Sequence, residues 1–453
     1  MASRKITRNA ATPKGFLRRV LDADLEAVAD PRQQAWVRHP LKAVLRLAVL
    51  ALATAARSTR AVENRSQQLR PQVRAQIGLE ERISDNAFGL VLQQVDWLEL
   101  RQALHRQVKA EWRRKNLRPP EDQKSTVAID GKHLASIPDN HLRSLISQHT
   151  DLDGEALSID QLRRVLRTQF PYVQLQVQED GPVNGLVRAH RATLISSDGA
   201  VLLDQWPIRG ETNEEKTIEA TLRALFQAYG RTGMIERVTL DAGNATEDVA
   251  ALLQRRKVAY LMAVKSSQGA LHSLAVDILG SVPGNQADFR MVVEERGKTI
   301  CYTVWTHRLD DEHGWSGARQ LIHVERIAAS VEETTEGHRY FVASEDVDEL
   351  NAEAALKLVR SHWRCENEGH WTADAIWDED ARRTPWTMHP RGVLVVGLLR
   401  AMAINILAVL RALSWLKRGD DWVTPTWKTV IEDALIVLCR PLLNMEAFNA
   451  LDG

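Results

Sequence analysis

Two aspartates each close a short run of strand-forming residues. Asp130 follows "STVAI" in the stretch "STVAIDGKHL" (125–134), and Asp241 follows "VTL" in "VTLDAGN" (238–244). The carboxyl ends of strands in open α/β sheets form the edge where ligands bind. Two carboxylates brought together there repel each other, and both stay ionised when a cation lies between them. Mg²⁺, which prefers oxygen ligands, is the cation that such a pair predicts. Two ordinary turn aspartates remain the alternative.

A third group of ionisable residues lies in "VRSHWRCENEGHWTADAIWDEDARR" (359–383). If this segment is helical, one face carries four groups spaced four residues apart: His362, Glu366, His370 and Asp374. Glu366 could then complete an acidic metal site, whereas an amphipathic helix with a polar stripe would show the same spacing. A zinc site of His362, Glu366 and His370 is a further interpretation. It departs from the HExxH pattern and places the two histidines two turns apart.

The charge of the chain is unevenly distributed although its formal net charge is zero over 453 residues. Residues 1–120 carry 23 Lys and Arg against 11 Asp and Glu, a balance of +12, so the remainder carries −12. A basic first quarter suggests a polyanionic partner. Arg113, Arg114 and Lys115 form its densest run and could contact phosphates, which positions a protein on DNA. A solvated basic helical surface explains the same charge.

The remaining composition favours a cytoplasmic protein without a membrane segment. The three cysteines are scattered and lack CxxC spacing, as in a reducing compartment without a disulfide framework. The first twenty residues contain no apolar run typical of a secretory signal. The apolar stretch 41–61 has ten residues between Arg46 and Arg57, which is too short to span a bilayer.

The hydrophobic periodicity predicts an α/β chain that begins with helices. Residues 16–115 are expected to be helical, a Pro-rich break follows at 116–125, and strands then alternate with helices. A strongly apolar helix is expected at 390–417. The predicted domains are a basic helical N-terminal domain at 1–120, a core in two parts at 121–269 and 351–412, a β-rich insertion at 270–350 and a helical tail at 413–453.

Three blocks of the sequence resemble the ISAs1-type branch of DDE transposases, the group that includes the H-repeat-associated proteins. They are "AIDGKHL", "TLDAGNATEDVAALLQRRKVAYLMAVKSSQ" and "SHWRCENEGHWTADAIWDEDARR". The last block matches the family pattern His-Trp-x-x-Glu-Asn-x-x-His-Trp-x-x-Asp and is the most specific. Shorter similarities are "ADPRQQ", "SDNAF" and "GETNEEK". The resemblance extends from about residue 20 to residue 410.

The resemblance implies an RNase H-like catalytic core with Asp130, Asp241 and Glu366 as an acidic triad that binds Mg²⁺, with Mn²⁺ as a substitute. The implied reaction is hydrolysis of a DNA phosphodiester at an element end, followed by attack of the freed 3′-hydroxyl on target DNA. The N-terminal domain would recognise terminal inverted repeats in double-stranded DNA, and pairing of two ends would favour a homodimer. The residues that would contact DNA in the core are Lys132, Lys265, Asn367, His370 and Trp371.

The sequence also departs from the family pattern. Gly369 and Ala373 stand where the family has large apolar residues, and 137–186 contains an extra helical stretch. The His-Gly-Arg-type motif expected in the insertion is replaced by "EERGKT" (294–299). These departures keep open a second hypothesis, a domesticated or impaired copy that binds DNA without cleaving it.

Overall fold

The computed structural model describes most of the chain. The described residues are 12–33, 37–177, 183–196, 200–212, 214–295, 297–330, 333–363, 365, 374, 376, 379, 386–414, 416–418 and 421–439.

The N-terminal region is helical, as the sequence predicts. Its helices are α1 (Pro13–Leu21), α2 (Leu41–Ala53), α3 (Thr59–Gln68), α4 (Pro71–Ile77), α5 (Asp85–Gln94) and α6 (Trp97–Arg113). Side chains cap several of these helices: the Ser84 hydroxyl accepts from Ala87 N–H at the start of α5, and Asp96 accepts from Leu98 N–H at the start of α6. α2 is buried along nearly its whole length. This burial agrees with the apolar stretch 41–61, which is too short to span a bilayer.

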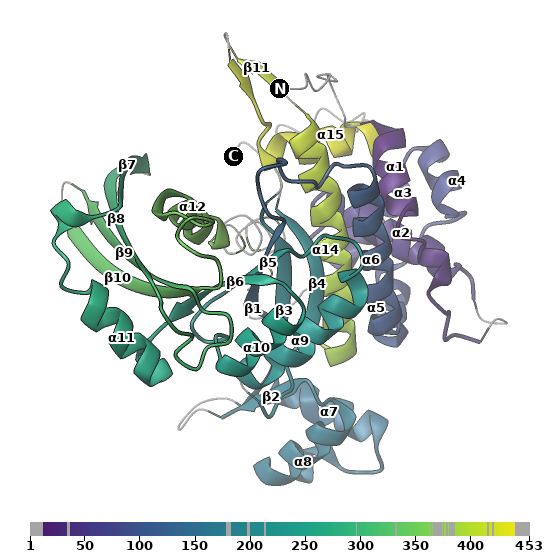
Figure 1. Ribbon diagram of the computed structural model, residues 1–453. Coiled ribbons are helices and arrows are strands. Elements are labelled where there is room, and N and C mark those ends of the chain that lie inside the picture. The colour runs from purple at the N-terminus through teal and green to yellow at the C-terminus, as the bar shows by residue number, and fades with distance from the viewer. Residues whose placement is uncertain are drawn as a thin grey trace.

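A large mixed sheet forms the centre of the molecule (Figure 1). Five of its strands are β1 (Thr126–Pro138), β3 (Asn184–Leu194), β4 (Val201–Pro207), β5 (Arg237–Leu240) and β6 (Ala259–Val264). They lie in the order β4-β3-β1-β5-β6, and the short strand β2 (Val173–Gln176) also pairs with β3. β1, β5 and β6 are parallel to one another, whereas β3 is antiparallel to β1 and β4. Helices α9 (Glu214–Tyr229) and α10 (Glu247–Arg255) connect β4, β5 and β6.

The β-rich segment after residue 270 continues the same sheet. Strands β7 (Phe289–Glu295), β8 (Lys298–Arg308), β9 (Gln320–Ala329) and β10 (Thr334–Ala343) are antiparallel, and β10 pairs with β6. They curve away from the N-terminal helices in Figure 1, with α11 (Gly269–Leu279) and α12 (Ala352–His362) packed against them. The strands therefore enlarge the sheet on the side of β6.

The segment between β1 and β3 contains α7 (Asp139–His149) and α8 (Ile159–Gln169), which project below the sheet in Figure 1. The expected helical tail is partly wrong, because a short hairpin of β11 (Leu416–Arg418) and β12 (Asp421–Val423) precedes α15 (Trp427–Leu438). These hairpin strands are only three residues long, which is too short for a periodicity to reveal.

Helix α14 (Pro390–Leu413) joins the N-terminal helices to the sheet. It is buried along nearly its whole length and packs against α2, α5 and α6 on one side and β4 and β1 on the other. It is long and apolar enough to cross a membrane by composition, with a mean hydropathy of 2.4 over its most apolar window, yet that window is 100% buried in the protein. The helix therefore serves as a core helix, and one continuous apolar core extends from α1 to α15.

Candidate active site

Asp130 and Asp241 occupy neighbouring positions on two parallel strands. The register pairs Ile129 with Leu240, so the next residues along β1 and β5 are Asp130 and Asp241. Neighbouring strands lie about 4.8 Å apart. Both side chains are half-buried at this edge. The two predicted carboxylates are therefore brought together.

The prediction that the first strand ends at Asp130 is wrong. β1 continues to Pro138, and beyond Ile129 it pairs with β3 alone, starting with Asp130 opposite Arg191. The physical reason is that β5 is short and ends at Leu240, so the parallel partner stops while the antiparallel partner continues. Asp130 thus lies at the point where β1 loses its pairing with β5.

Asp241 is held by a local hydrogen-bond network. Its Oδ1 atom accepts from the Asn244 side-chain amide at 2.7 Å. Gln268 donates to the carbonyl oxygens of Ala242 at 2.8 Å and Ala245 at 3.2 Å, which ties the loop after β6 to the loop after β5. This brings Lys265 to the same edge, where its side chain is exposed. The position of Lys265 is compatible with the predicted phosphate contact.

A cleft of about 680 Å³ opens beside Asp241. Lys265, Arg339, His362 and Trp363 contribute to its walls. The Arg339 guanidinium lies 3.9 Å from the centre of the Trp363 ring, so a cation and an aromatic face stack within the cleft. This combination of a carboxylate, cations and an aromatic ring suits a phosphodiester with an attached base.

His362 is fixed on the sheet side of this cleft. Its Nδ1 atom lies 2.8 Å from the hydroxyl of Thr239 on β5. Burial lowers the pKa of His362 to about 4, although the nearby Asp241 carboxylate opposes the shift. The ring is therefore neutral at pH 7 and contributes no positive charge to the site.

The segment 359–383, which we call the acid-bearing segment because it contains Glu366, lies largely outside the described residues. Glu366, Asn367, His370 and Trp371, as well as Gly369 and Ala373, all fall there, so their predicted roles stay predictions. Two described residues of the segment show how it is tied to the sheet. Asp374 accepts two hydrogen bonds from Lys132 Nζ, at 2.8 and 2.9 Å, and Glu379 accepts from both terminal nitrogens of Arg191, at 2.7 and 2.8 Å.

Lys132, a predicted phosphate contact, pairs with Asp374 in this structure, and its contact with DNA stays a prediction. Its side chain is 6% exposed and its ammonium group contacts Asp374, so in this structure it faces the protein. Glu379 and Arg191 are almost completely buried, and Arg400 of α14 lies 3.4 Å from Glu379. Burial opposes ionisation of Glu379, but the two arginines and Lys132 hold its pKa far below the usual range. The ion pairs hold Asp374 beside Lys132 of β1 and Glu379 beside Arg191 of β3.

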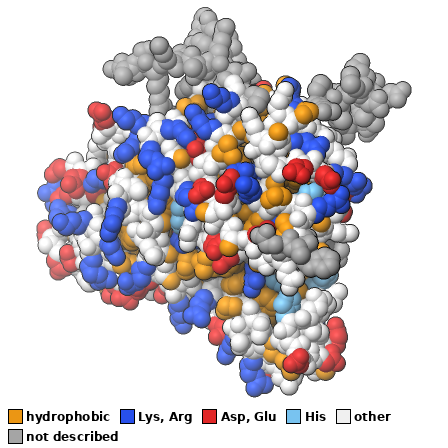
Figure 2. All heavy atoms as spheres, turned by 90° about the vertical axis from the view of Figure 1, so that its right-hand side faces the viewer, with side chains coloured by type: hydrophobic (Ala, Val, Ile, Leu, Met, Phe, Trp, Pro, Cys, Tyr) orange, Lys and Arg blue, Asp and Glu red, His pale blue; other side chains and the backbone are white. Residues whose placement is uncertain are grey.

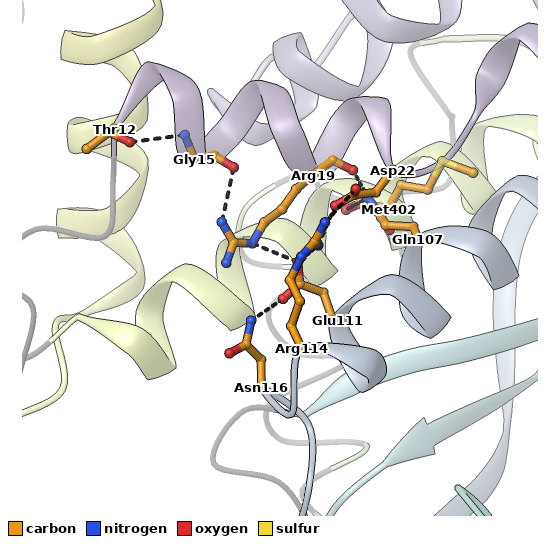
Figure 3. Close-up of polar contacts among 9 residues, drawn as sticks. All are labelled: Thr12, Gly15, Arg19, Asp22, Gln107, Glu111, Arg114, Asn116 and Met402. Carbon is orange, nitrogen blue, oxygen red and sulfur yellow. Dashed lines mark hydrogen bonds and ion pairs between the residues drawn. The ribbon is translucent and has the colours of Figure 1, made fainter. Parts of the chain in front are cut away.

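The predicted basic run at the end of α6 divides into exposed and paired members. Figure 3 shows Arg114 between the carboxylates of Asp22 and Glu111, and its contact with Glu111 is 2.8 Å. Arg113 and Lys115 are exposed. Arg118, three residues after Lys115, stacks on Trp112 with its guanidinium carbon 4.0 Å from the ring centre. Arg113 and Lys115 are thus the members that present charge to solvent.

Figure 2 views the side that carries the N-terminal helices in Figure 1. Lys and Arg side chains gather on the upper left of this view, and apolar side chains are visible near its centre.

Sequence reasoning missed two buried polar residues beneath the aspartates. Asn244 and His190 are both 0% exposed, and His190 Nδ1 lies 2.9 Å from the Thr221 hydroxyl. Asn244 and Asp241 lie close enough to His190 to raise its pKa, yet burial wins and lowers it to about 4. The only sequence signal was the position of Asn244 three residues after Asp241; a histidine within a strand gives none.

Comparisons with known proteins agree with the resemblance. Residues 23–108 match the family described as DDE_Tnp_1-associated. The chain is 25% identical over 361 residues to "Putative transposase YncI" of Escherichia coli O157:H7, covering 74% of this chain and 85% of that protein. It is 28% identical over 208 residues to "H repeat-associated putative transposase YhhI" of Escherichia coli K12, covering 43% and 53%. "Putative protein YbfL" of the same strain is 28% identical over 182 residues, covering 38% and 47%.

Proposed function

The chain carries a DDE_Tnp_1-associated domain and is related to H-repeat-associated transposases, and from this premise we propose that it is a DNA transposase. The proposed reaction is cleavage of DNA phosphodiesters at the ends of an insertion sequence and transfer of the 3′-hydroxyl ends into target DNA. The observation that supports it most is the juxtaposition of Asp130 and Asp241 at the open edge between β1 and β5.

The donor set fits a divalent cation. Two half-buried carboxylates on adjacent strands repel each other, and an oxygen-preferring cation such as Mg²⁺ or Mn²⁺ removes that repulsion. The Asn244 side chain orients one of these carboxylates, because its amide donates to Asp241 Oδ1 at 2.7 Å. Asp130, Asp241 and Glu366 would hold the cation. When bound, such ions activate a water or hydroxyl nucleophile and stabilise the leaving oxygen.

The strand order supports an RNase H-like core. Three strands with antiparallel neighbours, β4-β3-β1, are followed by the parallel strands β5 and β6, and the two aspartates lie at the junction between the antiparallel and parallel parts. The strands β7–β10 follow β6 before the acid-bearing segment, as expected for an insertion ahead of the last acid.

The protein's own residues would bind and orient the DNA. Lys265 and Arg339 offer positive charge to a phosphate beside Asp241, and Trp363 offers an apolar face to a base. Asn367, His370 and Trp371 would contact the DNA end. Arg113, Lys115 and the neighbouring N-terminal helices would contact terminal inverted repeats, with Arg114 held by its carboxylate partners. A homodimer acting on DNA in the cytoplasm completes this proposal.

The test is cleavage of DNA that carries the gene's own flanking ends, in the presence of Mg²⁺ or Mn²⁺. The wild type is expected to nick this DNA, and Asp241→Asn and Glu366→Gln are expected to abolish nicking. Asp248→Asn is the matched control, because Asp248 is an exposed acid on α10 near Asp241 in sequence. Loss of nicking in the control as well would remove the assignment of Asp241.

A parallel binding measurement separates the two hypotheses. If the wild type binds the ends but leaves them intact with either metal, the protein is a DNA-binding copy without catalysis. If it neither binds nor cleaves them, the transposase proposal fails.

A further inference from the structure

Three side chains that can bind a metal lie together on one face of the β9–β10 pair. His338 stands directly opposite Glu325 in the strand register, and Glu336 lies two residues before His338 on the same face of β10. One ligand atom from each of the three lies within 4.8 Å of the others. Glu325 is half-buried, whereas Glu336 and His338 are exposed. The protonation of the imidazole therefore decides what this group can bind.

A buried histidine next to the group, His323, is fixed in one orientation. It is 2% exposed, and its ring stacks on Trp305 and on Tyr340, with ring centres 4.7 and 4.5 Å away. Its Nδ1 atom lies 3.2 Å from the carbonyl oxygen of Leu279 at the end of α11. Because a carbonyl oxygen only accepts hydrogen bonds, Nδ1 carries the proton. Burial lowers the pKa of His323, and the nearby His338 lowers it further. At pH 7 the ring is therefore neutral, and its Nε2 atom can only accept.

His323 thereby sets the tautomer of His338. His338 Nδ1 lies 3.1 Å from His323 Nε2, and since that atom accepts, His338 Nδ1 donates. The neutral His338 ring then has its lone pair on Nε2, which lies 3.1 Å from Glu336 Oε1. Two acceptors thus face each other at hydrogen-bond distance, with the Glu325 carboxylate close to both. A cation, either a proton or a metal ion, must lie between them.

We propose that His338, Glu325 and Glu336 form a second metal site, which binds a divalent transition metal ion such as Zn²⁺. An imidazole nitrogen and carboxylate oxygens are ligands of Zn²⁺, whereas Mg²⁺ prefers oxygen ligands alone. The buried His323 would orient the ligating ring through its other nitrogen, as histidine ligands usually require.

This inference goes beyond the proposed function, because the site lies on β9 and β10 whereas Asp130 and Asp241 follow the β1–β5 pair. His338 nevertheless also lines the cleft beside Asp241. Two carboxylates and a neutral imidazole carry two negative charges, which a divalent ion neutralises. A polyanion entering the cleft along this wall would therefore meet less repulsion when the ion is bound.

The test is Zn²⁺ binding to the full-length protein in excess Mg²⁺, measured by competition with a chromophoric chelator and by the Zn²⁺-induced rise in melting temperature. Mg²⁺ is present to occupy the carboxylates of Asp130 and Asp241. The wild type is expected to bind a Zn²⁺ ion that Mg²⁺ does not displace. His338→Gln and Glu336→Gln should each weaken the Zn²⁺ affinity about tenfold or more. His307→Gln is the matched control, because His307 is an exposed histidine of the neighbouring strand β8.

Asp241→Asn separates this site from that of the proposed function. If Asp241→Asn retains Zn²⁺ binding and His338→Gln loses it, the second site stands whether or not the protein cleaves DNA. If Asp241→Asn loses Zn²⁺ binding and His338→Gln retains it, the ion binds at the acidic edge and the inference is overturned. An equal loss in His307→Gln would reveal unspecific binding to surface histidines, which also overturns it. A wild type that binds no Zn²⁺ would show that only a proton lies between His338 and Glu336, and the site would be rejected.

Discussion

His389 illustrates how burial sets the ionisation of single residues in this protein. The residue precedes the first turn of α14, is 6% exposed, and lies against His149 and Phe170, with ring centres 5.4 and 5.6 Å away. Burial lowers its pKa to about 4, and the charges of His149 and Arg391 act in the same direction. The folded protein therefore holds this ring neutral at pH values where an unfolded chain protonates it.

This predicts a loss of stability in acid. Between pH 6.5 and 4 the unfolded state binds a proton at His389 that the folded state does not, so the free energy of unfolding falls as the pH falls through this range. The contribution is present in full above pH 6.5 and amounts to at most about 3 kcal/mol. Urea unfolding of wild type and His389→Asn at pH 7 and pH 4.5 measures it, and the variant should lose less stability. Equal losses in both proteins would contradict the assignment.

Single residues also show what could be predicted from the sequence at this scale. Asp130 and Asp241 were identifiable because each follows a strand-forming run, and the strand register brings them together. His190 and Asn244 were not identified, because a strand histidine and a turn asparagine are common. Their importance arises from contacts with other residues, such as that of His190 with the Thr221 hydroxyl of α9.

At the scale of elements, α14 lies close to β4 at one glycine. A Cβ atom at Gly397 would be 2.6 Å from Gln205 Nε2 and 2.9 Å from Gln205 Oε1. The same Oε1 atom accepts from Arg191 Nε at 3.2 Å and from an Arg191 terminal nitrogen at 3.1 Å. The contact therefore supports the buried arginine that holds Glu379.

Alanine at two helical glycines should have opposite effects. Gly397→Ala is expected to lower the free energy of unfolding by about 1–3 kcal/mol, because Gln205 must move in a packed core. Gly89→Ala in α5 is expected to raise it by about 0.5–1 kcal/mol, because no atom lies within 4 Å of its Cβ position and alanine favours helix. Denaturant unfolding of both variants measures the difference. A stabilised Gly397→Ala protein would show that the helix and strand have room to separate.

The elements themselves were predicted unevenly from the sequence. Long periodic segments such as 85–113 and 390–413 are helices as expected, because their apolar faces determine their structure. β1 was predicted too short, since Gly131, Lys132 and His133 interrupt the apolar run and the strand beyond them is stabilised by pairing with β3, about 46 to 59 residues away. Pairing over such separations is invisible to local periodicity.

At the scale of the whole molecule, the N-terminal helices and the sheet share one core. Arg101 of α6 donates from Nε to Asp204 Oδ1 on β4 at 2.6 Å, and His105 Nε2 lies 3.2 Å from the same oxygen. Asp204 is 1% exposed. Because removal of one partner of a buried pair leaves an uncompensated charge, this contact joins the two layers strongly.

The predicted boundary near residue 120 should therefore not separate independently folding units. A chain of residues 121–453 is expected to lack a cooperative unfolding transition, since Asp204 would lose Arg101 and the face of α14 toward α2, α5 and α6 would be exposed. Arg101→Ala in the full chain should cost about 3–5 kcal/mol. Arg106→Ala is the control, because Arg106 on the same helix donates to the backbone carbonyls of Ala23 and Asp24 and lies 3.6 Å from the Asp24 carboxylate. A folded 121–453 fragment would refute this expectation.

The burial of α14 has a consequence for how the protein is made. Ribosomes release the N-terminal helices first, whereas the helix that closes their core lies at residues 390–413 of 453. Until it emerges, both layers expose apolar faces, and until it docks, the nascent segment has the hydropathy of a membrane-spanning helix. Translation that stops before residue 390 would consequently yield a product that aggregates and is degraded by proteases, in place of a stable N-terminal fragment. Competence to fold is thus conferred by a helix that is synthesised after both of the layers that it joins.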